Sequence, residues 1–561
     1  MSTTVTLTGA LPFLVLVAAL LAYPLSSLLL SLYRRSVQRG MASVAGGSAA
    51  PAAAASRRQP VVALRIELPL AARPAARQGP PSPLWQLATN GRWRAAAAYS
   101  AGGFAFAAIM TAGWLLATRD PAIVWIKLLV LFWTYCWPGV LPILLVAAYD
   151  RTRQSFVVGG YFAVLLALFA IALARNPEMA MHELPLHWIL TNAPPTLLVL
   201  AFLARPIRAV GSLVLAFLIV AAIGSQALLS LAAANETWLR SIATFAFRLG
   251  LGANAVFVGM ILAGMLAFAA GLGWPLLAWI GRRYEQKKTS DQSLMIDAQW
   301  LLFGLVQSIG LVFEGAAWIV TGLVAFTAFR LVSRAAMRRA VAAMGTAAAR
   351  PQTLLLLRVF ALGKRSERLF DRLRRHWQYV GNTTMIAGPD LVTGTIEPHE
   401  FLAFLSGRMA RQFIRDAADL ERRLATVDRA PDHDGRYRIS EFFCHDDTWQ
   451  MTMERLARDA DAILMDLRSF SPDNRGCIFE LGRLLDGIDL TRVVFLVDGS
   501  TDRAFLEATL HELWQNLGVE SPNQSASSPT ARVFEIARQD EGELSGLLRL
   551  LLAREVTNGG G

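Results

Sequence analysis

The residues best suited to chemistry follow an apolar run near the C-terminus. The segment 461–485 reads DAILMDLRSFSPDNRGCIFELGRLL, which is an apolar stretch followed by residues with helical spacing. Glu480 comes three residues after Cys477, early in the expected helix. A carboxylate in such a place can stabilise positive charge that develops during a reaction. Spacing alone favours a simpler interpretation, in which Glu480 is an exposed glutamate on a helix surface.

Four further polar residues accompany this pair. Asp466 and Arg468 stand at the end of the apolar run, and Ser469 and Asn474 follow in the expected loop. In parallel sheets, binding sites lie at the carboxyl ends of strands, near the switch in strand order. We therefore expect Asp466, Arg468, Ser469 and Asn474 to line the same pocket as Glu480.

The elements that position these residues alternate between strand and helix. Short apolar runs predict strands at 353–360, 383–387, 437–443, 462–467, 493–497 and 532–537. Helical spacing predicts helices at 364–379, 397–428, 448–458, 474–485, 502–517 and 540–553. Repeated strand–helix alternation implies a parallel sheet with helices on both faces. The sequence thus predicts a C-terminal α/β domain over residues 352–555.

The segment 461–485 resembles the third strand and following helix of TIR domains and, more loosely, nucleoside deoxyribosyltransferase relatives. Enzymatic TIR domains have a Glu three residues after a Cys, the spacing of Cys477 and Glu480. The resemblance extends over about 352–555, with 388–390 at the family's variable loop and 437–443 as an additional strand. It implies a flavodoxin-like sheet, self-association, and either NAD cleavage or an adaptor role without turnover.

The resemblance implies NAD as a substrate, with Glu480 as the catalytic residue and no separate cofactor. Breaking the nicotinamide–ribose bond passes through an oxocarbenium-like state, as glycoside hydrolysis does. A carboxylate beside the ribose stabilises that charge, and nicotinamide leaves as a neutral group without a strong acid. Asp466, Arg468, Ser469, Asn474 and Cys477 are then the residues expected to line the substrate pocket.

Composition places most of the remaining chain in a membrane. Hydrophobic residues make up 54% of the 561 residues and charged residues 17%, a balance that excludes a disordered chain and disfavours an ordinary soluble enzyme. Three Cys exclude a disulfide scaffold. The net charge of +12 would suit nucleic acid, but in so apolar a chain it indicates Arg-rich cytoplasmic loops. The expected partner is the lipid bilayer, and no nucleic acid is expected.

Apolar runs of about 20 residues predict membrane spans. Residues 11–32 are such a run, with no Lys or Arg before it and Arg34, Arg35 and Arg39 after it. This pattern predicts an uncleaved anchor over 1–33 with its N-terminus outside, and the alternative is cleavage in the Ala-rich stretch that follows. An Ala/Pro/Arg-rich cytoplasmic linker is expected at 34–96 and a multi-span domain at 97–334. Its expected spans are 97–118, 123–148, 156–174, 187–204, 209–233, 254–280 and 299–331.

These spans conflict with the charges that flank them. Eight crossings from an outside N-terminus leave the C-terminus outside, yet Arg330, Arg334 and further Arg residues after the last span indicate the cytoplasmic side. Either 299–331 is a tilted helix or a re-entrant pair, or 236–253 is an extra crossing or an interfacial helix. Glu314, within 299–331, is either a functional intramembrane carboxylate or a residue hydrogen-bonded inside the bundle.

Other motifs are weaker indications of a function. Cys444-His445-Asp446-Asp447 has metal-ligand types crowded together without a second half, so we expect a helix cap and no metal site. Gly363-Lys364 lacks the upstream Gly of a phosphate loop. Three functions stay open: a membrane-anchored NAD-hydrolysing enzyme, a membrane-tethered adaptor or nucleotide-binding module, and a transporter with a regulatory tail. In each, the chain is expected in the plasma (inner) membrane with its C-terminal domain cytoplasmic.

Overall fold

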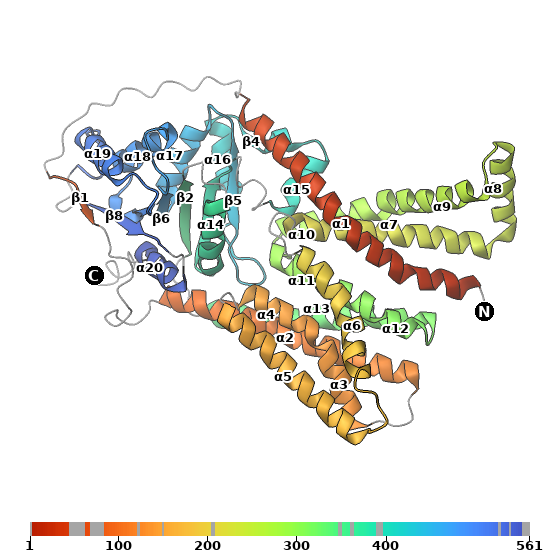
Figure 1. Ribbon diagram of the computed structural model, residues 1–561. Helices are drawn as coiled ribbons and strands as arrows, with labels where there is room; N and C mark the ends of the chain where they lie inside the picture. The colour runs from red at the N-terminus through yellow and green to blue at the C-terminus, as the bar shows by residue number, and fades with distance from the viewer. Residues whose placement is uncertain are drawn as a thin grey trace. The chain divides into compact units, whose positions relative to one another are not determined.

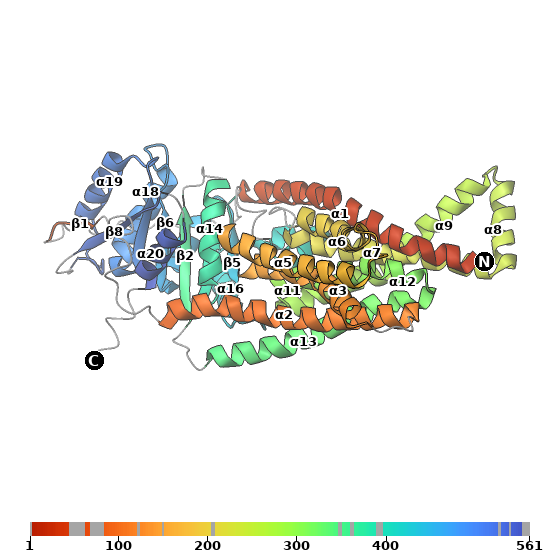
Figure 2. The ribbon, with the colours of Figure 1, turned by 60° about the horizontal axis from the view of Figure 1, so that its bottom comes forward.

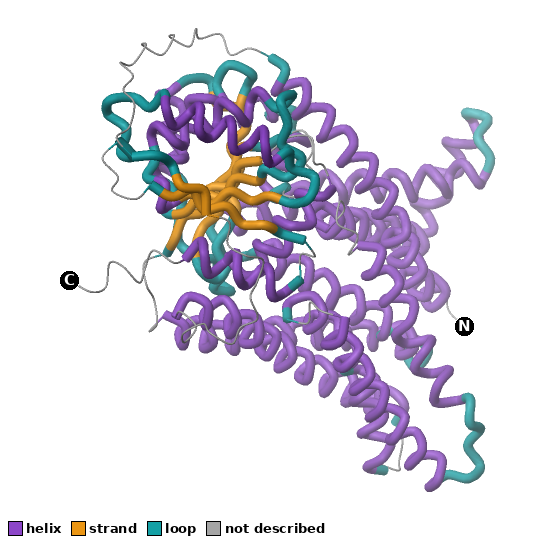
Figure 3. Tube along the Cα trace, turned by 60° about the vertical axis from the view of Figure 1, so that its left-hand side comes forward, coloured by secondary structure: helices purple, strands orange, loops and turns teal. Residues whose placement is uncertain are grey.

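The structure is a computed structural model, and the chain forms two compact units (Figure 1). It describes residues 3–43, 62–67, 83–119, 124–147, 151–202, 208–345, 351–358, 364–388, 396–524, 529–537 and 540–552. The first unit comprises Met1–Leu32, Arg92–Ala343 and Ile396–Leu402, and the second comprises Tyr33–Gly91, Met344–Thr395 and Ala403–Gly561. The first is helical, and the second contains the sheet (Figure 3).

The helical unit is built from long helices, several of which run alongside one another (Figure 2). Its helices are α1 (Thr3–Met41, which continues into the second unit), α2 (Pro83–Thr118), α3 (Trp125–Tyr135), α4 (Val140–Val146), α5 (Arg151–Arg175), α6 (Glu183–Phe202), α7 (Arg208–Ala234), α8 (Glu236–Arg248), α9 (Ala253–Phe268), α10 (Trp274–Glu285), α11 (Asp291–Gln307), α12 (Ile309–Val312) and α13 (Val320–Gly345). The short 3-10 helices η1 (Trp137–Gly139) and η3 (Ala316–Ile319) and the π-helical segment η2 (Ala269–Gly273) join some of them.

Seven segments of the described chain are long and apolar enough to cross a membrane. They are Asn90–Thr118, Trp125–Val146, Arg151–Arg175, Val210–Ala234, Ala253–Glu285, Asp291–Val312 and Ala317–Ala343. Each has at least 22 residues, which exceeds the roughly 20 that a bilayer core requires. The spans expected at 11–32 and 187–204 fall on α1 and α6, which are not among the seven, and stay predictions.

Polar side chains join α6 and α11 to their neighbours inside this unit. The amide of Asn192 donates to the carbonyl of Thr134 at 3.2 Å, and Gln307 Nε2 donates to Asn192 Oδ1 at 3.0 Å. Gln299 Nε2 donates to the carbonyl of Pro138 at 2.8 Å. Such hydrogen bonds hold helices together where no water competes for the donors.

The prediction of one crossing at 299–331 was wrong, because the chain turns back at Glu314 and Gly315. Gly315 has a φ of 151°, and Glu314 lies exposed in the turn rather than in the middle of a helix. Helices α11 and α13 are antiparallel: Arg330 pairs with Asp297 at 3.1 Å, and nearer the turn Gly304 faces Gly322. A Cβ on Gly322 would collide with the Gly304 carbonyl oxygen, so only glycine permits this approach.

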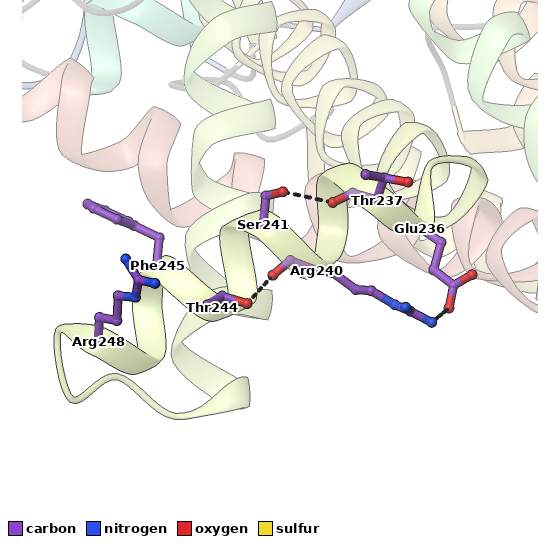
Figure 4. Close-up of a pocket in the computed structure, with 7 residues that line it drawn as sticks. All are labelled: Glu236, Thr237, Arg240, Ser241, Thr244, Phe245 and Arg248. Carbon is purple, nitrogen blue, oxygen red and sulfur yellow. Dashed lines mark hydrogen bonds and ion pairs between the residues drawn. The ribbon is translucent and has the colours of Figure 1, made fainter.

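Helix α8 settles the question of an extra crossing at 236–253. Its 13 residues span only about 20 Å, too short to cross a bilayer core. Figure 4 shows its polar side chains: Arg240 pairs with Glu236 at 2.6 Å, and the Ser241 hydroxyl donates to the carbonyl of Thr237. Phe245 is exposed on the same helix. The extra-crossing alternative is therefore wrong, and α8 is a short amphipathic connector between α7 and α9.

The second unit contains a parallel sheet, as the sequence predicted. Its strands are β1 (Arg65–Glu67), β2 (Gln352–Arg358), β3 (Gly381–Ile386), β4 (Phe413–Ile414), β5 (Ile439–Cys444), β6 (Ala462–Asp466), β7 (Val493–Val497) and β8 (Thr530–Glu535). Eight described strands pair in parallel in the order β1-β8-β7-β6-β2-β3-β5-β4. The central strands β6 and β7 are wholly buried, as apolar strands of a parallel sheet are.

Helices cover both faces of this sheet (Figure 3). The helices of the unit are α14 (Lys364–Trp377), α16 (Ala417–Thr426), α17 (Trp449–Asp459), α18 (Arg475–Gly487), α19 (Arg503–Gln515) and α20 (Glu541–Leu552), while α15 (Pro398–Leu405) begins in the helical unit and ends in this one. One core packs α17, α18 and α19 against Ile463 and Met465, and the other packs α14 and α20 against Leu464. Alternate residues of β6 thus pack into opposite cores, which fixes the register in which β6 pairs with its neighbours.

Two expectations about connecting segments were wrong. The helix expected at 397–428 is broken, because Gly407 adopts a φ of 67° and the chain then forms β4 before α16 begins. The segment 34–96 is not only a linker: α1 continues to Met41, β1 adds a strand beside β8, and α2 begins at Pro83.

Candidate functional site

The site is built where the strand order of the sheet switches direction. Strand β2 continues through α14 to β3 on one side, while β6 continues through α18 to β7 on the other. These two helices pack on opposite faces, so the strand order switches between β2 and β6, the place where parallel sheets commonly bind ligands. The last residues of the two strands, Arg358 and Asp466, are paired directly across the sheet.

Asp466 and Arg468 form a bidentate ion pair at this edge. Arg468 Nε lies 2.7 Å from Asp466 Oδ1, and Arg468 Nη2 lies 2.6 Å from Oδ2. Both side chains are 0% exposed, and Arg468 Nη1 has no hydrogen-bond partner among the described residues. Because a buried guanidinium is costly without full pairing, Nη1 is a donor available to an anion.

Glu480 lies in the second turn of α18 and is only 2% exposed. Its Oε2 has no hydrogen-bond partner among the described residues. Burial raises the pKa of Glu480 to about 8, and the positive charge of Arg358 limits that rise. The carboxyl is therefore mostly protonated at pH 7 in the unliganded chain.

Cys477 joins α18 to the end of β2. Its thiol donates to the carbonyl of Arg358 at 3.8 Å, and its side chain is buried. Burial, followed by the negative charges of Glu480 and Asp466, raises the pKa of the Cys477 thiol. A thiol that stays protonated is a packing residue rather than a nucleophile.

The structure brings four of the six predicted residues together and sets the other two apart. Asp466, Arg468, Cys477 and Glu480 converge at the switch point, where the first two are paired and both carboxylates act on the Cys477 thiol. Asn474 Oδ1 accepts hydrogen bonds from the backbone N–H and the hydroxyl of Ser471, so its side chain shapes the loop.

Ser469 points to the neighbouring loop. It has a φ of 59°, and its hydroxyl lies 2.9 Å from that of Ser500, in the loop that follows β7. Ser500 in turn donates to Asp498 Oδ1. The two loops at the carboxyl edge are thereby tied together beside the buried cluster.

Arg358 is the residue of this cluster that sequence reasoning missed. It ends the apolar run of β2, is buried, and interacts electrostatically with Glu480. A basic residue closing a strand that is otherwise apolar was the available signal. The loops that follow β2 and β3, residues 359–363 and 389–395, lie outside the described residues, and so do Gly363 and most of the segment 388–390.

A second group of polar residues lies in the helical unit. Glu397, His399 and Glu400 bring potential metal-ligating atoms within 4.8 Å of one another. These groups already engage one another: His399 Nδ1 lies 3.3 Å from Glu397 Oε2, and the backbone N–H of Glu397 donates to Glu400. The Tyr284 hydroxyl donates to Glu397 at 3.1 Å.

The segment 444–447 makes a different contact from the helix cap that we expected. His445 Nδ1 lies 2.8 Å from the Gly40 carbonyl and 2.9 Å from the Ser43 hydroxyl. The Thr448 hydroxyl accepts from the backbone N–H of His445. Within the second unit, His445 therefore fastens the end of α1 to the edge of the sheet.

Comparison with protein-family models, curated proteins and solved structures found no match. The geometry of the site itself carries the functional argument. A neutral buried carboxyl, an arginine that interacts with it and an unpartnered guanidinium nitrogen meet at the switch point of a parallel sheet. The unpartnered guanidinium nitrogen can donate a hydrogen bond to an anionic oxygen.

Proposed function

We propose that the chain is a multi-pass membrane protein of the inner membrane whose cytoplasmic α/β unit binds NAD and hydrolyses its nicotinamide–ribose bond. The observation that carries this proposal is the convergence of Glu480, Arg358 and the Asp466–Arg468 pair at the switch point. The strands β3-β2-β6-β7-β8 have the 2-1-3-4-5 order of a flavodoxin-like sheet, with β5 and β4 added beyond β3 and β1 added beyond β8. This order agrees with the TIR-like resemblance of 352–555.

The reaction follows from the charges of the bound dinucleotide. The nicotinamide ring of NAD is cationic, and its approach lowers the pKa of Glu480 so that the carboxyl loses its proton. The carboxylate then stabilises the oxocarbenium-like ribose as the bond breaks. Nicotinamide leaves with the bonding electron pair, and water adds to the ribose with loss of a proton, giving ADP-ribose. Arg468 Nη1 is placed to donate to a phosphate oxygen.

The proposed orientation rests on the number of crossings and on charge. The seven apolar segments, with α1 and α6 counted as crossings as well, make nine. Nine crossings from an outside N-terminus leave residues 346–561 inside. The basic residues Arg334, Arg338 and Arg339 of α13 favour the same side.

The experiment is nicotinamide release from NAD by the purified full-length chain, at a concentration high enough to permit self-association. Glu480→Gln keeps the shape and removes the charge, and we expect a loss of roughly a hundredfold or more. Glu507→Gln is the matched control, because Glu507 is an exposed glutamate on α19 of the same unit. Equal rates for the wild-type and Glu480→Gln chains would refute the catalytic role of Glu480.

One observation favours a second function, a membrane-tethered adaptor or nucleotide-binding module. A glutamate that is 2% exposed and neutral also suits a structural role inside the domain. If neither chain releases nicotinamide while the protein self-associates, the adaptor becomes the better proposal. The transporter has less support, because Glu314 lies exposed in a turn.

A further inference from the structure

A cavity of about 180 Å³ lies inside the helical unit, between α7, α10, α11 and α13. Its volume is well below the roughly 300–1,000 Å³ of pockets that enclose a whole cofactor. It therefore has room for one polar group rather than for a complete ligand. None of the residues that line it takes part in the site of the α/β unit.

The polar part of this cavity carries an excess of positive charge. Arg330 pairs with Asp297 at 3.1 Å, and Arg283 and Arg334 are close enough to interact electrostatically with the same carboxylate. Arg283 stacks on the Trp279 ring at 4.8 Å, and its Nε is buried with no hydrogen-bond partner among the described residues. Arg283 and Arg330 line the cavity with Asp297, and Arg334 acts on the same carboxylate without lining the cavity, so positive charge exceeds negative charge around it.

The rest of the cavity is apolar. Leu215 and Ile219 of α7, Leu301 of α11 and Phe326 of α13 form its walls. Trp279 is 41% exposed beside Arg283, near the end of the span Ala253–Glu285. Tryptophan at the end of a span is typical of the level of lipid headgroups. An amphiphile matches these surroundings better than a fully hydrated anion does.

We propose that this cavity binds the phosphate of an anionic phospholipid, with Arg283 and Arg330 as donors and the acyl chains outside along the apolar helices. Guanidinium groups recognise phosphate oxygens through paired hydrogen bonds. Basic pockets between membrane helices on the cytoplasmic side bind such headgroups. The inference rests on the proposed membrane location and is independent of any activity at Glu480.

The experiment titrates the full-length chain, in phosphatidylcholine bicelles, with short-chain phosphatidylglycerol or with inorganic phosphate. We expect phosphatidylglycerol to bind about tenfold more weakly to Arg283→Gln, which loses one charge-assisted donor. The matched control is Arg282→Gln, because Arg282 is the exposed neighbour on the same helix and does not line the cavity. Asp297→Asn removes the competing carboxylate, so binding should tighten.

The outcomes distinguish a lipid site from attraction by bulk charge and from a site for free phosphate. Equal weakening by Arg282→Gln and Arg283→Gln would overturn the site, since only bulk charge would then matter. Binding of inorganic phosphate as tight as that of phosphatidylglycerol would overturn the lipid as the source of the phosphate. Membrane flotation of the chain is measured alongside: a chain that does not float refutes the membrane location, whereas a chain that floats without lipid preference refutes only the cavity.

Discussion

At the scale of single residues, the cluster around Glu480 combines features that a surface glutamate does not have. Its carboxyl is buried, its Oε2 lacks a partner among the described residues, and Arg358 is the charge that interacts with it. Leaving a carboxyl in such surroundings is destabilising unless it stays protonated. The sequence placed Glu480 on a helix near the carboxyl edge of the sheet, but spacing alone favoured an exposed side chain, because burial depends on the contacts that α18 makes with β2.

The raised pKa of Glu480 predicts how stability depends on pH. Between the ordinary value of 4.5 and about 8, the folded chain keeps a proton that the unfolded chain has lost. The free energy of unfolding therefore falls as pH rises through this window and levels off above about 8. Glu480→Gln resembles the protonated form, so it should lack this fall and exceed the wild type at pH 9, by on the order of a few kcal/mol.

The measurement is denaturant unfolding of wild-type, Glu480→Gln and Glu507→Gln chains between pH 5 and 9. Substitution of the exposed Glu507 should leave the wild-type profile unchanged. If the wild-type and Glu480→Gln profiles run parallel across the whole range, Glu480 is not a buried protonated carboxyl.

At the scale of elements, glycine decides where two of the long apolar helices pack and where the chain turns between them. Gly304 and Gly322 allow α11 and α13 to touch along their backbones, and Gly315 makes the turn between them. The apolar run over 299–331 predicted a single span, because hydropathy does not reveal a turn between two apolar helices. The sequence likewise predicted a single helix over 397–428, because helical spacing does not show that the positive φ of Gly407 ends α15. Buried strands such as 493–497 were found because their apolar runs are local.

The hairpin of α11 and α13 predicts opposite effects for two similar substitutions. Gly322→Ala forces a Cβ against the Gly304 carbonyl and should lower the free energy of unfolding by about 1–3 kcal/mol. Gly310→Ala places its Cβ in open space, so it should be neutral or slightly stabilising because alanine favours helix. Thermal unfolding of the detergent-solubilised chain, followed by tryptophan fluorescence, distinguishes them. Equal effects of both changes would contradict the close crossing.

At the scale of the whole molecule, the count of crossings fixes the side on which the α/β unit lies. If α11 and α13 form separate crossings, their turn lies on the opposite side of the membrane from the basic end of α13. The basic flanks in the sequence indicated the cytoplasmic side even when the number of crossings did not. The place of Arg358 in the site was not predicted, because Asp466, which is paired with it across strands β2 and β6, lies more than a hundred residues away in the chain.

A cysteine at position 314 tests this topology. Glu314 is exposed, and the natural residues Cys136, Cys444 and Cys477 are all buried, so a Glu314→Cys chain carries one accessible thiol in the described parts. In intact cells, a membrane-impermeant maleimide should label Glu314→Cys and leave the wild type unlabelled. Labelling only after the cells are opened would place the turn inside and remove the ninth crossing.

The most direct test of the central claim is the proton released when NAD binds. The ligand is an NAD analogue in which a methylene group replaces the oxygen of the nicotinamide-bearing ribose ring, so that its bond to nicotinamide stays intact. Titration calorimetry in buffers of different ionisation enthalpy counts the protons. With a pKa of about 8, Glu480 holds close to one proton at pH 7, and a cationic ring beside it should displace that proton. The wild-type chain should therefore release nearly one proton more than Glu480→Gln does. Binding with the same proton release in both chains would contradict an NAD site beside Glu480.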